Sequence, residues 1–385
     1  MKLMEYQAKL LFQKYALPVM HGCVIDRVED LASAIETEKV SYPLVVKVQI
    51  QSGHRGQAGG IQFADNFEEA KKHSENLLGR EMLGYTVKKL YLVEKADYKT
   101  EWYLSIMLDR LSKQPIIIFC AEGGMEIEET AKVNPSAIKK IVIDPMIGVQ
   151  DYMARYLLSS SGLDIAYTKQ LDALLKKLYK CFMDYDCMLT EINPLVVDNN
   201  DQLIALDGKV DIDDSALYRL PDVMAWRDEL PVEDLVKEAR EFDFLYIPCE
   251  EGGSIAVCSN CSGMLMSCID RITKNGMHVG AVLDLGGGAT AARIREAMRI
   301  LFSTPGVKAV LINIFGGITR CDEVAGGVKL AMENGDLDGK FIVVRMEGTN
   351  KDIGIGIINS LDADVVLADG LRESVATLLE RRDRL

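Results

Sequence analysis

The first 226 residues mix helical and strand patterns without a simple repeat. Apolar side chains recur at helical spacing in some segments, whereas β-branched or alternating residues dominate others. This mixture predicts an α+β region. Helices are expected at residues 5–15, 29–38 and 149–186, and strands at residues 19–25, 44–50, 90–95, 101–107 and 115–120, the last three in one antiparallel sheet with short connections.

The rest of the chain follows a different pattern. After a polar, acidic segment at residues 227–241, interpreted as a connection, five short apolar runs are each followed by a helical segment. Repeated β-then-α units favour a parallel, doubly wound sheet with flavodoxin-like strand order. The strands are expected at residues 254–259, 279–285, 307–315, 341–347 and 365–368, and the two domains at residues 1–238 and 239–385.

Length and charge restrict what such a chain can do. Its 385 residues exceed the roughly 250 to 300 at which a single core stops growing, which also indicates more than one domain. The net charge of -14 argues against nucleic acid and anionic membranes as partners. The nine cysteines are scattered, an odd count that does not suggest a disulfide framework, and the sequence shows neither a leader nor a long apolar stretch. We therefore expect a soluble cytoplasmic protein, or an organelle-matrix protein if the chain is a processed form.

A predicted hairpin in the first region supplies oxygen ligands. Strand-like runs flank the polar turn at residues 198–201, a strong hairpin signal. A turn centred there places Asn193 opposite Asp207, and Glu191 opposite Lys209, on one face of the hairpin. One carboxylate and one amide oxygen suit Mg²⁺ that bridges nucleotide phosphates. The alternative is a solvated polar face.

Lys47 lies within the apolar run V-V-K-V. A buried ammonium is costly unless it meets an anion, and phosphate is the natural candidate. Alternatively, Lys47 lies on an edge strand and reaches water. A glycine-rich loop carrying Arg55 follows, and we expect it to be mobile. Glu94 and Glu101 bracket a later turn, where a carboxylate could accept ribose hydroxyls or an adenine amine, or simply be a surface charge.

The loops after the strands of the second region are rich in glycine. They read N-C-S-G at residues 260–263, D-L-G-G-G-A-T at 284–290 and N-I-F-G-G-I-T-R-C-D at 313–322. Such loops present backbone N–H groups to a carboxylate or phosphate near a helix N-terminus, or they are ordinary tight turns. The sequence has neither G-x-G-x-x-G at the first turn nor a Walker motif, which disfavours a nicotinamide dehydrogenase.

Further motifs occur in order between residues 5 and 322. They are E-Y-Q-A-K at 5–9, V-V-K at 45–47, R-G-Q-A-G-G at 55–60, E-G-G-M-E-I-E at 122–128, E-I-N-P-L at 191–195 and L-D-G-K at 206–209, together with the two glycine loops at 284–290 and 313–322. With these motifs the chain resembles the β subunits of succinyl-CoA synthetases and their malate-CoA ligase relatives.

The resemblance implies an ATP-grasp region of two subdomains followed by a flavodoxin-like CoA-ligase domain. It also implies phosphoryl transfer from ATP or GTP to a histidine and then to a dicarboxylate such as succinate, after which CoA forms the thioester. The implied site residues are Lys47, His54, Arg55, Gly56, Glu94 and Glu101 for the nucleotide, Asn193 and Asp207 for Mg²⁺, Glu191 for the phosphohistidine loop, and Asn260, Gly317, Ile318 and Thr319 for the organic acid.

The same resemblance places the phosphohistidine and the CoA site on a partner α subunit, so we expect a hetero-oligomer. Two departures from the family pattern stand out. His54 replaces a small residue, and Gln57 replaces a lysine; His54 either supplies the lost charge when protonated or points outward. The loop after Asn260 also lacks the usual Gly-Ala-Gly.

Two other functions remain open at this stage. A stand-alone ATP-grasp carboxylate ligase would share Lys47, Asn193 and Asp207 but would act without a partner. A divergent nucleotide-binding regulatory subunit would account for the altered loop at residues 53–57.

Overall fold

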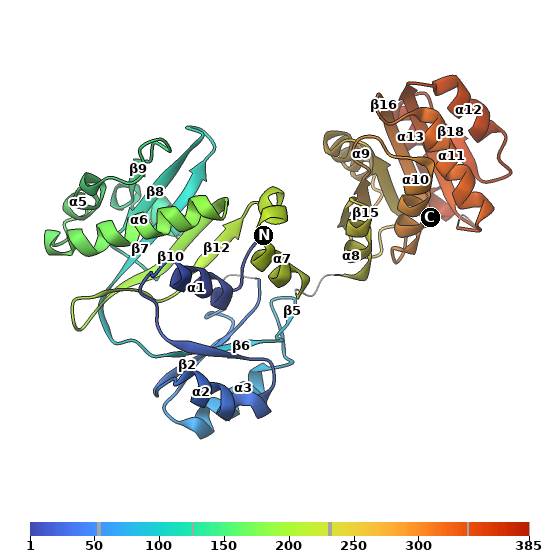
Figure 1. Cartoon of the computed structure of the whole chain (residues 1–385). Helices are drawn as coiled ribbons and strands as arrows, with labels where there is room; N and C mark the ends of the chain where they lie inside the picture. Colours follow the sequence, from blue (N-terminus) through green and yellow to red (C-terminus); the bar gives the residue numbers. More distant parts are fainter. Residues whose placement is uncertain (52–54, 125–126, 230–232, 337–338, 385) are drawn as a thin grey trace. The chain divides into compact units, whose positions relative to one another are not determined.

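The computed structural model describes residues 1–51, 55–124, 127–229, 233–336 and 339–384. The chain forms two compact units, Met1–Glu229 and Leu230–Leu385, and each is described by itself below (Figure 1). Within the described ranges, no helix has both the length and the apolar character needed to cross a bilayer.

The smaller part of the first unit is a four-stranded antiparallel sheet. Its elements are β1 (Gly22–Ile25), α2 (Leu31–Glu38), β2 (Leu44–Val48), β3 (Ile61–Ala64), α3 (Phe67–Leu77) and β6 (Leu90–Glu94), with the short pair β4 (Glu81–Met82) and β5 (Tyr85–Thr86) before β6. The helix α1 (Glu5–Lys14) precedes β1 in the chain but packs mainly in the core of the larger part. The strand order is β1-β6-β2-β3, and α2 and α3 pack on one face (Figure 1). β2 is therefore an interior strand, and all five of its residues are buried.

The expectation that residues 90–95 pair with the next two strands is wrong. β6 pairs with β1 and β2 of the small sheet. Its first four residues are all apolar or aromatic and all buried, so the strand needs cover on both faces. Leu90 and Leu92 pack in the cluster that includes α2 and α3, whereas Tyr91 and Val93 pack with Tyr6 of α1 on the other face. The other two runs, β7 (Tyr98–Asp109) and β8 (Gln114–Cys120), do pair antiparallel as expected.

The larger part of the first unit is a six-stranded sheet. Besides β7 and β8 it contains β9 (Lys139–Val142), β10 (Cys187–Asp198), β11 (Leu203–Ala205) and β12 (Lys209–Ile212), and the helices of this part are α4 (Ile127–Val133), α5 (Asp151–Ser160), α6 (Thr168–Asp184) and α7 (Pro221–Asp228). The order is β11-β10-β7-β8-β9, and β12 also pairs with β10. Buried side chains of α1, α5 and α6 form the main core with inward residues of β7 and β10, among them Trp102 and Ile192.

The second unit is a doubly wound sheet. Its elements are α8 (Asp234–Glu241), β13 (Leu245–Pro248), β14 (Ile255–Ser259), α9 (Ser262–Lys274), β15 (Val279–Asp284), α10 (Ala291–Ser303), β16 (Ala309–Gly316), α11 (Cys321–Glu333), β17 (Phe341–Gly348), α12 (Lys351–Asn359), β18 (Val365–Leu367) and α13 (Leu371–Glu380). The parallel strands follow the order β15-β14-β16-β17-β18, which confirms the flavodoxin-like prediction. Apolar clusters lie on both faces, against α9 and α13 on one and α8, α10 and α11 on the other.

Two features of this unit were not expected. β13 adds an antiparallel edge strand to β15. The polar segment interpreted as a connection contains α8, whose Ala239 is fully buried in the core of the second unit. The boundary expected between residues 238 and 239 falls inside α8, whereas the compact units meet between Glu229 and Leu230.

Candidate functional site

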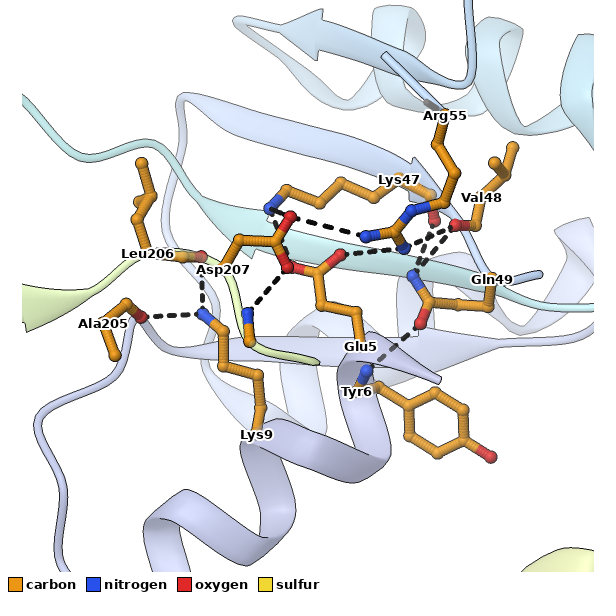
Figure 2. A network of polar contacts seen from close by, with 11 residues as sticks. Glu5, Tyr6, Lys9, Lys47, Val48, Gln49, Arg55, Ala205, Leu206 and Asp207 are labelled. Atoms are coloured by element: carbon orange, nitrogen blue, oxygen red, sulfur yellow. Dashed lines mark hydrogen bonds and ion pairs between the residues drawn. The ribbon is translucent and has the colours of Figure 1, made fainter. Parts of the chain in front are cut away.

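Two cations and two carboxylates meet between the sheets of the first unit. The Lys47 Nζ atom lies 2.7 Å from Glu5 Oε1 and 4.0 Å from Asp207 Oδ2. The Arg55 guanidinium lies 3.1 Å from Glu5 Oε2 and 3.4 Å from Asp207 Oδ2 (Figure 2). Because β2 is interior and the Lys47 side chain is only 8% exposed, the alternative of an edge lysine that reaches water is excluded.

The hairpin expected around residues 198–201 brings three oxygen-bearing side chains to the same place. β10 pairs with β11, and Glu191 stands opposite Lys209, as the sequence predicted. Glu191, Asn193 and Asp207 line one cavity of about 290 Å³. Arg55 and Gly56 line the same cavity, together with Lys2, Leu3, Glu5, Ile50, Gln51, Ile61, Gly208 and Lys209.

Local hydrogen bonds orient the three side chains. Asp207 Oδ1 accepts from the Gly208 N–H at 2.7 Å, and Asn193 Oδ1 accepts from the Gly124 N–H at 2.8 Å. The Tyr103 hydroxyl on β7 donates to Glu191 Oε2 at 3.0 Å. Burial and the neighbouring Glu191 carboxylate both raise the pKa of Tyr103, so this hydroxyl keeps its proton.

Charges in the cluster alter one another's protonation. Burial alone would raise the pKa of the Glu5 carboxyl, but the cations Lys47, Arg55 and Lys9 outweigh burial and lower this pKa to about 2. Burial and the Lys47 cation lower the pKa of Lys9 to about 8. Burial and the Glu5 carboxylate raise the pKa of Asp207, although its side chain is 26% exposed. Glu5 therefore stays ionised at neutral pH.

This lowered pKa makes acid stability depend on Glu5. An ionised Glu5 stabilises the fold above the unfolded pKa near 4.5, and this contribution is lost as the pH falls through about 2. At pH 7 we expect the free energy of unfolding of the native chain to exceed that of Glu5→Gln by about 3 kcal/mol. At pH 3 this difference should be smaller by about 2 kcal/mol, as measured by urea titration. An equal difference at both pH values would contradict the lowered pKa of Glu5.

The structure does not bring every expected nucleotide residue to this cavity. Glu94 ends β6 and accepts a hydrogen bond from the Ser41 N–H at 2.8 Å, away from the cavity lining. Glu101 also lies outside the lining; its carboxylate is next to Gly124 and accepts from Tyr98, which raises the pKa of that phenol to about 12. His54 lies outside the described residues.

The reasoning from sequence missed Glu5, Lys9 and Tyr103 as members of this site. Glu5 and Lys9 are four residues apart on α1 and therefore project from the same side of the helix. Lys9 Nζ donates to the carbonyl oxygens of Ala205 and Leu206, at 3.0 and 2.7 Å. The signal was a charged pair at helical spacing within a segment that is otherwise part of the core. Tyr103 carried no comparable signal.

A second group of expected residues meets at the carboxyl ends of the strands in the second unit. Asn260 follows β14; its Nδ2 donates to the Phe315 carbonyl at 2.9 Å and its Oδ1 accepts from the Phe315 N–H at 3.2 Å. Thr319 is buried, and its hydroxyl oxygen accepts from the Gly288 N–H at 3.1 Å. Gly317 and Ile318 are exposed beside it. The loops after β14, β15 and β16 are thus tied into one rim.

The oxygen atoms at the first cavity fit a hard divalent cation. Asn193 and Asp207 offer one amide and one carboxylate oxygen to the same cavity. Within the part of the chain that the structure describes, no group of three or more His, Cys, Asp and Glu side chains could hold a metal. Two protein oxygen ligands are what Mg²⁺ uses when phosphates and water complete its coordination shell.

Comparison with known proteins accounts for both units. Residues 2–197 match the ATP-grasp domain and residues 258–378 match the CoA-ligase family. The ADP-forming succinate–CoA ligase subunit beta of Chloroflexus aggregans is 42% identical over 379 residues, which cover 98% of each chain. The protein of the same name from Persephonella marina is 38% identical over 387 residues and 99% of each chain. That from Halorubrum lacusprofundi is 35% identical, over 97% of this chain and 98% of its own.

Solved structures agree at the level of the fold. The ATP citrate lyase of Methanothrix soehngenii, in complex with citrate and coenzyme A, has a TM-score of 0.77 and covers 98% of this chain and 99% of its own. Because the two sequences are only 18% identical, this similarity shows a shared fold and nothing more. The full-length relatives and the two domains in this order confirm the resemblance seen in the motifs: this chain belongs to the family of succinate–CoA ligase β subunits.

Proposed function

We propose that the chain is the nucleotide-binding β subunit of an NDP-forming acid:CoA ligase, which converts succinate or a related dicarboxylate, CoA and ATP or GTP to acyl-CoA, NDP and phosphate. The main support is one cavity that is lined by Arg55, Glu191, Asn193 and Asp207. The Lys47 ammonium lies 4.0 Å from the Asp207 carboxylate. Fixed cations beside oxygen ligands are what a transferring phosphoryl group requires.

In this proposal Lys47 and Arg55 bind the nucleotide phosphates, with Gly56 letting the backbone approach closely. Asn193 and Asp207 hold Mg²⁺. The bound metal would neutralise charge that develops on the phosphoryl oxygens. Because the Lys47 side chain is almost fully buried, its charge acts through a less screened medium than water and stabilises an anion more strongly.

Glu191 is proposed to meet the histidine of a partner α subunit. Its carboxylate is oriented by Tyr103 and lines the cavity, so it is placed to accept a hydrogen bond from an imidazole N–H and direct the other ring nitrogen at the phosphoryl group. Of the described histidines, His21, His73 and His278, none lines this cavity. A phosphohistidine supplied by a second chain, and hence a hetero-oligomer, fits that arrangement.

The second unit is proposed to bind the organic acid. Asn260, Gly317, Ile318 and Thr319 lie at the carboxyl ends of β14 and β16, where ligands of doubly wound sheets bind. A stand-alone carboxylate ligase would give no role to this CoA-ligase domain, and the full-length relatives are β subunits by name. The altered loop at residues 53–57, which motivated the alternative of a regulatory subunit, lies partly outside the described residues.

The test is reconstitution. The chain, co-expressed with a succinate–CoA ligase α subunit, should form thioester from CoA and succinate, or a related dicarboxylate, in the presence of ATP or GTP and Mg²⁺. Neither chain should form the thioester by itself. No CoA-dependent turnover with any dicarboxylic acid by a folded complex, or full turnover by this chain alone, would overturn the proposal.

Replacing Asn260 gives a more specific prediction. Asn260→Ala removes both hydrogen bonds to the Phe315 backbone, so the end of β16 loses its connection to the loop after β14. We expect the KM for the acid to rise by about tenfold to a hundredfold, with phosphorylation of the partner histidine unchanged. Steady-state kinetics at saturating nucleotide measures this. Asn275→Ala, at the exposed C-terminal end of α9, is the control. An unchanged KM would remove Asn260 from the acid site.

A further inference from the structure

The buried carboxylate of Glu5 has no part in the chemistry proposed so far. Its side chain is fully inaccessible to solvent, and it makes the closer contacts to both cations, at 2.7 Å to Lys47 and 3.1 Å to Arg55. Asp207, which is partly exposed, makes the longer contacts, at 4.0 and 3.4 Å. Each cation is therefore shared between two carboxylates and lies nearer to the buried one (Figure 2).

The helix that carries Glu5 also holds the loop that carries Asp207. One turn after Glu5, the buried Lys9 ammonium donates to the carbonyl oxygens of Ala205 and Leu206, the two residues before Asp207. Glu5 and Lys9 project from the same side of α1. A single helical turn thus sets where the cations lie and where the Asp207 loop lies.

We propose that Glu5 is a positioning residue that holds Lys47 and Arg55 away from Asp207, so that Asp207 remains available to the divalent cation that accompanies the nucleotide. The inference rests on the proposed function. Buried charges need a partner, and a buried cation that loses one moves toward the next. Without the Glu5 charge, the nearest carboxylate to both cations among the described residues is Asp207. The cations would then compete with the metal.

Removal of the Glu5 charge therefore has opposite effects on two measurable affinities. The cavity gains net positive charge, so nucleotide phosphates should bind without metal as tightly as before, or more tightly. Asp207 becomes occupied by the cations, so the metal should bind more weakly. A residue needed only for folding would weaken both affinities together.

The experiment uses the complex with the α subunit and ADP as the probe, by isothermal titration calorimetry in EDTA and across a MgCl₂ series. For Glu5→Gln we expect the metal-free affinity to be retained or increased, and the Mg²⁺ concentration that half-maximally enhances ADP binding to rise by about tenfold or more. Parallel loss of both affinities, or an unchanged Mg²⁺ requirement, would overturn the inference.

Two more variants complete the design. Glu5→Asp keeps the charge but shortens the side chain by one methylene, and we expect a smaller rise in the Mg²⁺ requirement; it carries the test if Glu5→Gln does not fold. No rise in Glu5→Asp would then overturn the inference. Glu36→Gln, on the exposed face of α2, is the matched control and should behave like the native chain. If the native complex binds neither ADP nor GDP, the proposed function itself fails.

Discussion

Phosphorylation of the partner histidine should fall by about a hundredfold to a thousandfold when Asp207 is replaced by alanine. Asp207 is the single carboxylate among the two proposed Mg²⁺ ligands, and its loop is held by Lys9. Its loss removes the charge that would draw the metal to the cavity. Transfer of label from the γ-phosphate of ATP to the α subunit measures the effect directly.

The control for this variant is Asp97→Ala, which removes an exposed carboxylate in the turn between β6 and β7. Both variants should still associate with the α subunit, as size-exclusion chromatography would show. If Asp207→Ala transferred label to the α subunit as the native chain does, Asp207 would not be a Mg²⁺ ligand, and the interpretation of the hairpin as a metal site would be wrong.

Replacement of Lys47 by methionine should damage both stability and nucleotide binding. Methionine retains much of the side-chain volume but leaves the fully buried Glu5 carboxylate with only Arg55 close to it and Lys9 farther away. Breaking a buried ion pair costs about 3 to 5 kcal/mol in free energy of unfolding. We also expect ADP binding to weaken by at least about a hundredfold, since hydrogen bonds from a charged donor to phosphate are among the strong ones.

The double variant with Glu5→Gln separates these two effects. Removal of both charges leaves neither side chain as an unpaired buried ion, so most of the lost stability should return while ADP binding stays weak. Chemical denaturation and calorimetry of the single and double variants test this. Lys71→Met, on the exposed face of α3, is the control. Recovery of ADP binding in the double variant would show that Lys47 does not contact the nucleotide.

Much of the fold could be predicted from the sequence because its signals are local. The order of the five parallel strands follows from repeated β-then-α units, which permit few topologies. The register that places Glu191 opposite Lys209 follows from a turn only four residues long, because a short turn fixes which residues face each other. These are properties of neighbouring residues, and any fold that keeps them gives the same result.

Other features required tertiary contacts. The sequence predicted a strand at residues 90–95, but it did not predict its partners. β6 pairs with β1 and β2, and not with β7, because its position in the small sheet buries both of its faces. α8 was not predicted because its segment is mostly polar and has few apolar residues. Those few residues pack in the core of the second unit, which only the tertiary structure shows.

The site divides in the same way. The sequence by itself indicated that Lys47 lies in an apolar strand and that its ammonium, if buried, needs an anion, because the cost of a buried ammonium is independent of the fold around it. The tertiary structure then decided that this strand is interior and that the ammonium is buried. Only the tertiary structure decided that a carboxylate from Glu5, 42 residues earlier in the chain, meets that ammonium, and that α1 also holds the Asp207 loop. Contacts between distant segments depend on how whole elements pack, and no local pattern of residues specifies that.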